Sequence, residues 1–254
     1  MAEFSSPMPL EPRVCAVIPV YDHGATVGAV VAGLRDCGLP CIVVDDGSGP
    51  ECARILDQLA LHEPGVTLLR QVTNHGKGAA VACGLRGARA AGFTHALQID
   101  ADGQHAIADV PAFMAATRAE PEAIICGRPV FDHTIPRARL YGRRFTRLWV
   151  NINTLSTGIP DAMCGFRVYP VRFTDDLLRA QPAGRRMDFD IGVLVRLSWR
   201  GAPMHWIDTQ VIYPPGGVSH FRLLRDNVLI SAMHAKLFFG MLLRLPVLLW
   251  RKIR

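Results

Sequence analysis

Two aspartates separated by a single residue, Asp100 and Asp102, directly follow an apolar segment. Carboxylates two positions apart on an extended turn can both approach one hard divalent cation, and such a cation also binds phosphate oxygens. Without a cation the two negative charges would repel a diphosphate, whereas a bound metal reverses that sign. The pair therefore predicts a metal site that accepts a phosphorylated ligand. The alternative is an aspartate-rich turn with solvated carboxylates.

Polar residues also follow two other apolar segments. Asp45 and Asp46 could accept hydrogen bonds from a nucleobase and a ribose, although a helix-capping turn before Pro50 would use the same residue types. In Gly76-Lys77-Gly78, glycine lets the backbone approach a ligand and Lys77 offers a cation to a phosphate. The segment lacks the upstream glycine and the Ser or Thr of a Walker loop, so a plain glycine turn with a solvated lysine is the alternative.

Short apolar segments, several of them rich in β-branched residues, alternate with helix-like segments in the first half of the chain. This alternation predicts right-handed crossovers and an α/β fold with a largely parallel, Rossmann-like sheet flanked by helices. Ligands bind beyond the carboxyl ends of the strands in such a sheet, so the polar segments should meet at one edge. The expected strands are Val14–Val20, Cys41–Val44, Val66–Arg70, His95–Ile99 and Ala123–Cys126, and the expected helices are Thr26–Leu34, Pro50–His62, Gly78–Ala91 and Asp109–Ala119.

The second half of the chain differs from the first in both pattern and charge. Up to Gly127 there are eight Lys and Arg against 14 Asp and Glu, and after it there are 20 against eight. An acidic half beside a basic half predicts a cation site next to a surface for anions. We expect a long helix at Arg137–Ser156, a strand near Phe166–Tyr169, a helix near Asp190–Trp199, a strand near Met204–Val211 and then an apolar tail.

The overall composition is that of a globular protein, because 50% of the 254 residues are hydrophobic and 20% are charged. The seven cysteines form no Cys-x-x-Cys pair and lie mostly in apolar segments, which predicts reduced thiols and a reducing cytosol. The first residues lack the pattern of a secretory signal, so we expect no export.

Six segments in this order resemble those of glycosyltransferase family 2, and in particular the branch of the dolichyl- and polyprenyl-phosphate sugar synthases. They are VIPVYD, IVVDDGS, NHGKGAA, LQIDADGQH, CGRP and DAMCGFRVYP, running from about Val14 to Pro170, with a weaker match in SHFRLLRDN near Ser219. The resemblance implies a GT-A fold and an inverting transfer of a sugar from a nucleotide diphosphate donor, with Mg²⁺ or Mn²⁺ as cofactor. It further implies that Pro19, Tyr21, Asp45 and Asp46 line the nucleotide pocket, that Asp100, Asp102 and Gln104 hold the metal, and that Arg128 faces the acceptor.

Two positions depart from the family pattern. Asp22 and His23 stand where the family often has Asn-Glu, which leaves the nucleobase open, and Gly192 stands where many relatives have an acidic residue. A second interpretation therefore stays open, namely a nucleotide-sugar-binding protein at the membrane that has lost turnover. A nicotinamide-dependent oxidoreductase is disfavoured, because no Gly-x-Gly-x-x-Gly follows the first expected strand. Nucleic-acid binding is not expected, since the basic residues lack aromatic interleaving or a known module.

The choice of acceptor decides whether the reaction needs a base. A sugar hydroxyl must lose its proton to a carboxylate, for which Asp161, Asp188 and Asp190 are the candidates and Asp161 is preferred. Asp161 could also be an ordinary turn residue. A lipid phosphate needs no base, and Arg or Lys should then line the acceptor site.

Arginines in the second half favour an anionic acceptor. Arg139, Arg143 and Arg147 share one face of the expected long helix, where like charges cost stability unless an anion offsets them. An acceptor phosphate or anionic headgroups would do so, and a solvated face is the alternative. Arg222 and Arg225 could close over the donor pyrophosphate as a lid, unless the glycine-rich segment before them is a plain surface loop.

The apolar segment Val228–Trp250 is interrupted by Lys236 and Arg244, and Pro246 would kink a helix, so we expect no transmembrane helix, which needs roughly 20 apolar residues. The final residues 250–254 combine a tryptophan with three cations, as peripheral anchors on the cytosolic face of a membrane do. A core helix with a subunit contact, and hence a homo-oligomer, is the alternative. The expected division is a flexible N-terminus (1–12), a GT-A domain (13–226) and an amphipathic, membrane-associated helical tail (227–254).

Overall fold

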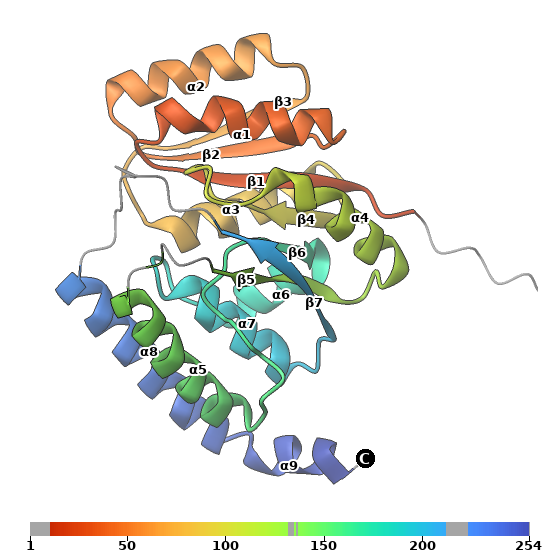
Figure 1. Ribbon diagram of the computed structural model, residues 1–254, viewed down its shortest axis with the longest axis vertical. Coiled ribbons are helices and arrows are strands. Elements are labelled where there is room, and N and C mark those ends of the chain that lie inside the picture. The colour runs from red at the N-terminus through yellow and green to blue at the C-terminus, as the bar shows by residue number, and fades with distance from the viewer. Residues whose placement is uncertain (1–10, 132–134, 136, 212–222, 254) are drawn as a thin grey trace, which may run out of the picture.

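A central sheet organises the protein (Figure 1). The computed structural model describes residues 11–131, 135, 137–211 and 223–253, of which residues 137–139, 223 and 224 by their backbone alone. The seven strands lie in the order β3-β2-β1-β4-β6-β5-β7, and β6 is antiparallel to both of its neighbours while the other pairs are parallel. The largely parallel α/β sheet expected from the sequence is confirmed. The strands are β1 Val14–Val20, β2 Cys41–Asp46, β3 Val66–Gln71, β4 His95–Gln98, β5 Ile124–Val130, β6 Arg167–Pro170 and β7 Met204–Gln210.

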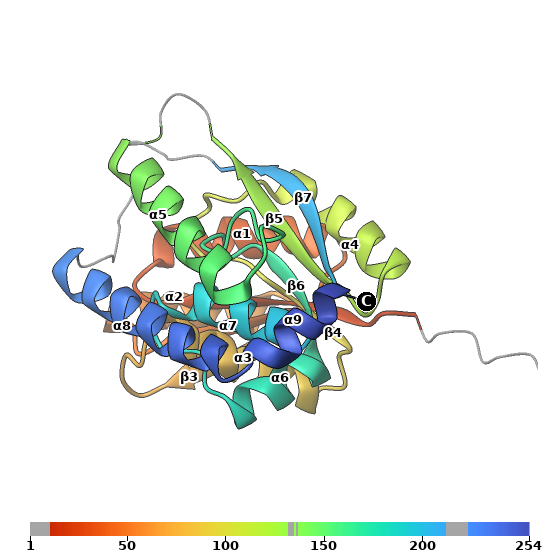
Figure 2. The ribbon, with the colours of Figure 1, turned by 90° about the horizontal axis from the view of Figure 1, so that it is seen from below.

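Helices cover both faces of the sheet (Figures 1 and 2). Successive side chains of a strand point to opposite faces, so Cys15 and Val17 of β1 join one apolar cluster and Ala16 and Ile18 join the other. The second cluster is closed by α1 Gly24–Asp36, α2 Pro50–His62 and α4 Val110–Ala119, which follows the short 3₁₀ turn η1 Ile107–Asp109. The first cluster is closed by α3 Lys77–Ala90, α6 Val171–Ala180, α7 Phe189–Trp199 and, outside them, α5 Arg137–Thr154 and α8 Leu223–Leu242.

Two differences from the expected elements affect the site. Strand β2 continues through Asp45 and Asp46, and β5 continues through Arg128, so these residues belong to the ends of strands rather than to the loops after them. Helix α6 was not expected, because its buried side chains include the β-branched Val171 and Thr174, which favour strands in isolation. Tertiary packing against α3 and α7 decides its conformation.

The C-terminal segment forms α8 and α9 Leu245–Ile253, with Pro246 in the first turn of α9. Within the described residues, no helix alone has the length and apolar character to cross a bilayer; Arg225–Leu242 and Leu245–Ile253 meet that test only as a pair, bent by 67°. Met233, Leu237 and Met241 of α8 are buried in the core. The expected boundary after residue 226 falls in the first turn of α8, and the division of the chain stays a prediction.

Close packing of α3 on the sheet gives a stability test. A Cβ at Gly84 would collide with Val17 Cγ1, whereas a Cβ at Gly28 on α1 would meet no atom within 4 Å. We expect Gly84→Ala to lower the free energy of unfolding by about 1–3 kcal/mol through overpacking. The matched variant Gly28→Ala should raise it by about 0.5–1 kcal/mol, because alanine costs less entropy in a helix. Urea unfolding followed by circular dichroism measures both, and equal effects would contradict the packing argument.

Candidate active site at the carboxyl edge of the sheet

The carboxyl ends of β1, β2 and β4 lie side by side. Val20 of β1 pairs with Asp45 of β2, and Val17 pairs with Gln98 of β4, so Asp100 follows β4 at about the level of Pro19. The turn after β4 is held by α1, because Thr26 Oγ1 donates a hydrogen bond of 2.6 Å to the carbonyl oxygen of Ala101. Pro19 is buried within β1, and Tyr21 is half-buried just beyond it. The polar segments expected at one edge are therefore neighbours.

Asp45 and Asp46 are buried and bind the loops on either side of them. Asp45 accepts hydrogen bonds from Ser48 N at 2.9 Å and from Arg70 Nε at 2.9 Å. Asp46 accepts from the backbone N–H groups of His75 and Gly76, both at 2.8 Å. Burial raises the pKa of the Asp46 carboxyl, and these two backbone donors oppose that shift without cancelling it. Each carboxylate oxygen keeps further acceptor capacity for a ligand.

Lys77 lies between two carboxylates. Its Nζ is 2.8 Å from Asp100 and 2.9 Å from Asp190, and Asp190 also accepts a hydrogen bond of 2.9 Å from Gln98 Nε2. Burial alone lowers the pKa of Lys77, but the two carboxylates outweigh it and raise the pKa above its usual range. Burial likewise raises the pKa of Asp100, and Lys77 with His105 more than reverses this, so that the pKa lies below its usual range. Lys77 is thus an internal counter-ion, and its contact with a donor phosphate stays a prediction.

The sequence analysis missed an arginine beneath this cluster. Arg167 of β6 is fully buried and donates hydrogen bonds to the carbonyl oxygens of Asp190 at 2.7 Å and Ala162 at 2.8 Å. It also contacts Tyr169 Oη at 3.3 Å, which donates to Gln98 Oε1 at 3.3 Å. This network holds the start of α7 against β4 and thereby positions Asp190. The sequence could have indicated this network, because Arg167 stands inside an apolar strand and a buried arginine rarely lacks partners.

The donor set of Asp100 and Asp102 fits a divalent cation. Asp100 Oδ1 is buried and accepts no hydrogen bond within the described residues, although Lys77 Nζ is 2.8 Å away. Asp102 Oδ1 accepts a hydrogen bond from Gln104 N at 3.0 Å, and Asp102 Oδ2 takes no part in that hydrogen bond. In the described part of the chain no three His, Cys, Asp or Glu side chains form a metal cluster by themselves. Carboxylate oxygens are the ligands that Mg²⁺ prefers.

The other candidate bases are engaged by the protein. Asp161 Oδ1 accepts from Met163 N at 2.9 Å and Cys164 N at 2.8 Å, and Oδ2 is ion-paired with Arg143. Asp188 Oδ1 accepts from Arg186 N at 3.0 Å. Asp161 therefore binds the backbone of the turn before β6 and pairs with the long helix α5, and its role as a base stays a prediction.

The arginines assigned to the acceptor contact different parts of the protein. Arg128 is exposed and paired with Asp208 of the neighbouring β7, NH2 to Oδ2 at 2.8 Å. Arg143 pairs with Asp161 and also stacks over Phe131, 4.8 Å from the ring centroid, while Arg147 is exposed. The side chain of Arg139 and the whole of Arg222 lie outside the described residues.

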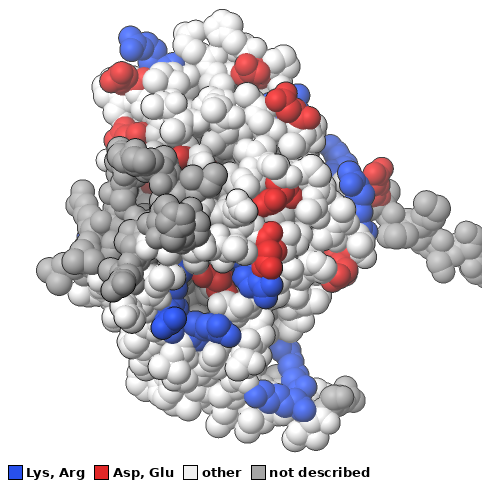
Figure 3. Space-filling view, viewed as in Figure 1, with Lys and Arg blue, Asp and Glu red and all other residues white. Residues whose placement is uncertain are grey.

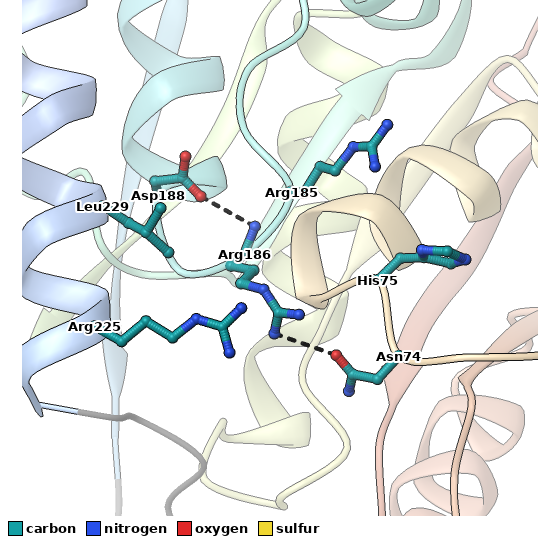
Figure 4. Close-up of a pocket in the computed structure, with 7 residues that line it drawn as sticks. All are labelled: Asn74, His75, Arg185, Arg186, Asp188, Arg225 and Leu229. Atoms are coloured by element: carbon teal, nitrogen blue, oxygen red, sulfur yellow. Dashed lines mark hydrogen bonds between the residues drawn. The ribbon is translucent and has the colours of Figure 1, made fainter.

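A cavity of about 320 Å³ lies between the loop after β3, the loop before α7 and the start of α8 (Figure 4). Arg186 and Arg225 point into the same space, and Arg185 points away from it on the other side of its loop. On the face shown in Figure 3, Lys and Arg gather on the lower part, over the end of the molecule that carries α5, α8 and α9. The arginines that line the cavity all come from the second half of the chain. The cavity is lined by Asn74, His75, Arg185, Arg186, Asp188, Arg225 and Leu229.

The structure bears on Asp22 and Gly192, two of the residues that depart from the family pattern. Asp22 has a left-handed backbone with φ of 53°, and its Oδ1 accepts from Gly49 N at 2.8 Å, a conformation that aspartate and asparagine tolerate. At Gly192, a Cβ would collide with the carbonyl oxygen of Ala183. An acidic side chain would push that loop away, so glycine here is required by packing.

Comparison with known proteins places the chain in a family. The model of glycosyl transferase family 2 matches residues 15–178, more than half of the chain, and the chain belongs to this family. It is 28% identical to polyprenol monophosphomannose synthase of Mycolicibacterium smegmatis over 62% of this chain and 61% of that protein. It is 27% identical to undecaprenyl-phosphate mannosyltransferase of Micrococcus luteus (66% and 69%) and 33% identical to dolichyl-phosphate β-glucosyltransferase ALG5C of Trichomonas vaginalis (50% and 40%). These relatives belong to the branch that the sequence motifs resemble.

Solved structures agree on the fold. Glucosyl-3-phosphoglycerate synthase of Mycobacterium tuberculosis superposes with a TM-score of 0.62 over 92% of this chain and 80% of that chain, at 15% identity. Mannosyl-3-phosphoglycerate synthase of Rubrobacter xylanophilus superposes with a TM-score of 0.61 over 92% of this chain and 74% of that chain, at 17% identity. The GT-A fold expected from the sequence is confirmed.

The ion pairs of Lys77 lead to a second stability test. Removing the cation in Lys77→Met leaves Asp100 and Asp190 facing each other without compensation, and breaking a buried pair costs about 3–5 kcal/mol. Because Lys77 and Asp100 retain some solvent contact, we expect a loss of about 3 kcal/mol in the free energy of unfolding. Lys236→Met, at an exposed position on α8, is the control and should change it by less than about 0.5 kcal/mol. Equal unfolding midpoints in urea would contradict the role of Lys77.

Proposed function

We propose that this protein is an inverting, metal-dependent glycosyltransferase that moves a sugar from a nucleoside diphosphate donor to a polyprenyl phosphate at a membrane surface. The observation that carries the proposal is the meeting of two aspartate pairs, Asp45–Asp46 and Asp100–Asp102, at the carboxyl edge of the sheet in a member of glycosyl transferase family 2. The names of three curated relatives refer to polyprenol, undecaprenyl phosphate and dolichyl phosphate.

The donor pocket is proposed along the ends of β1 and β2. Pro19 and Tyr21 form one wall, and Asp45 and Asp46 use their remaining acceptor capacity for the nucleoside. A neighbouring structure, glucosyl-3-phosphoglycerate synthase, was solved with Mn²⁺ and uridine-diphosphate-glucose, which supports a divalent cofactor in this fold. In this chain Asp100, Asp102 and Gln104 would hold the cation. When bound, it neutralises the charge that develops on the departing diphosphate.

Two of the three candidate bases, Asp161 and Asp190, are already hydrogen-bonded and ion-paired by the protein, which favours an acceptor that arrives ionised. Asp161 is held by two backbone donors and Arg143, and Asp190 is held by Gln98 and Lys77. At neutral pH a phosphate monoester is largely a dianion and needs no base: one of its oxygens bonds to the anomeric carbon while the bond from that carbon to the diphosphate breaks. The nucleoside diphosphate then leaves without any proton transfer. The protein's task is to hold the reactants in line and to compensate their charge.

Association with a membrane is proposed for the face formed by α8 and α9. Leu243 and Ile253 are 84% and 86% exposed, and further exposed apolar side chains on these helices include Phe239, Val247 and Trp250. Exposed Lys236 and Lys252 lie on the same helices. An apolar surface flanked by cations matches an anionic lipid interface, where aromatic rings sit at headgroup level and cations bind phosphates. Cytosolic location and self-association stay predictions.

The metal-dependent step has a direct test. Asp102→Asn keeps the shape of the turn but removes a charge from the cation site, so transfer of sugar from a nucleotide donor to farnesyl phosphate should fall by about 10²–10³-fold. Removal of divalent ions with EDTA should abolish transfer, and Mg²⁺ or Mn²⁺ should restore it. Asp36→Asn, at an exposed position on α1, is the matched control with unchanged rate. Products are measured by mass spectrometry, and full activity of Asp102→Asn would refute the proposal.

Membrane association is tested by flotation with vesicles that contain anionic phospholipid. Leu243→Asp places a charge in the proposed contact face, so the floated fraction should fall at least fivefold. Leu61→Asp introduces the same charge at a residue of α2 that is 74% exposed, and it should leave flotation unchanged. High salt should weaken the binding of the unaltered protein because it screens the lysines. An equal loss in both variants would argue against this face.

A further inference from the structure

Two guanidinium groups at the cavity beside α3, α7 and α8, those of Arg186 and Arg225, form no ion pair within the described residues. Arg225 forms no hydrogen bond or ion pair within the described part of the chain, where the guanidinium of Arg186 donates a hydrogen bond only to the neutral Asn74 Oδ1, at 3.3 Å. The charge of Arg186 also acts to lower the pKa of the Asp46 carboxyl. Figure 4 shows both groups directed into the same space. Of the charged residues lining the cavity, three are arginines and one is an aspartate, Asp188. Like charges that converge in this way favour an anion between them.

The chain holds Arg186 in place through its backbone. Arg186 N donates to Asp188 Oδ1, and the carbonyl oxygen of the preceding Arg185 accepts from Ala79 N in the first turn of α3 at 3.0 Å. Gly76 has φ of 101° and no room for a Cβ, because that atom would meet the carbonyl of Arg185 and the side chain of Arg186. The loop before α7 is therefore packed against the start of α3, and the position of Arg186 is built into the fold.

The same start of α3 connects this cavity to the aspartates. Gly76 N donates to Asp46, and Lys77 Nζ contacts Asp100, while Asn74 lines the cavity. Three peptide units separate Asn74 from Lys77, so their Cα atoms are at most about 11 Å apart. An anion in the cavity would thus lie near the proposed donor site without sharing its carboxylates.

We infer that this cavity is a binding site for a phosphate monoester, held by Arg186 and Arg225. Guanidinium groups match phosphate oxygens in geometry and remain charged at every relevant pH. A volume of about 320 Å³ accommodates the phosphate group and the first atoms of its substituent. This inference rests on the proposed function in one respect, because it takes the bound phosphate to be that of the polyprenyl phosphate acceptor.

Direct binding separates this inference from the transfer reaction. Three probes are titrated calorimetrically into the full-length protein without a sugar donor: farnesyl phosphate, inorganic phosphate and uncharged farnesol. We expect farnesyl phosphate to bind, farnesol not to bind, and the double variant Arg186→Gln/Arg225→Gln to weaken farnesyl phosphate at least tenfold. Binding of inorganic phosphate with the same dependence on both arginines means that the phosphate group alone is recognised, and binding of farnesyl phosphate alone means that the chain contributes.

Controls keep the result interpretable. Arg225→Gln alone changes an exposed residue in the first turn of α8 and should weaken farnesyl phosphate several-fold, even if the double variant folds poorly. Arg54→Gln, exposed on α2, should change nothing. The affinity of a nucleoside diphosphate with Mn²⁺ should stay within twofold in every variant.

Unchanged farnesyl phosphate binding in the double variant would overturn the inference. An equal loss of nucleotide affinity would also overturn it and would assign the cavity to the donor. Binding that depends on the arginines without any transfer by the unaltered protein would remove the proposed function and leave the site. Transfer that survives in the double variant at unchanged acceptor KM would remove the phosphate site and leave the proposed function.

Discussion

The ion pairs of Lys77 with Asp100 and Asp190 are the constraint on which the site depends. They join the start of α3, the end of β4 and the start of α7, three elements that are distant in sequence. A cation between two carboxylates compensates their charge where solvent is limited, and Arg167 supports the arrangement from below through the carbonyl of Asp190. Electrostatic balance at this point keeps acidic groups together at the edge where a phosphorylated ligand is expected.

The loop from Asn74 to Lys77 serves both sides of the site. Its backbone N–H groups hold Asp46, its lysine holds Asp100, and Gly76 lets the arginine-bearing loop before α7 approach. Because these contacts share a few residues, a shift of this loop would move the proposed donor and phosphate sites together. The site is thus positioned by backbone packing, which suits a reaction that depends on alignment more than on proton transfer.

Much of the fold and of the donor side could be predicted from the sequence, since both depend on local patterns. Alternating apolar strands and amphipathic helices define a parallel sheet, and residues that follow parallel strands meet at one edge. Asp45, Asp46, Asp100 and Asp102 were found in this way. Helix α6 and the antiparallel direction of β6 were harder to predict, because the conformation and direction of a short segment depend on contacts with distant elements.

What the sequence determined by itself was the family, the alternating strands and helices of the first half and the residues at the carboxyl edge, because each follows from motif, periodicity and strand direction. Tertiary structure alone decided which charges compensate one another. Asp161 pairs with Arg143, Lys77 lies between two carboxylates, and Arg186 and Arg225 converge without forming an ion pair within the described residues. Such pairings join side chains tens of residues apart, and their partners depend on three-dimensional proximity, which local pattern does not encode.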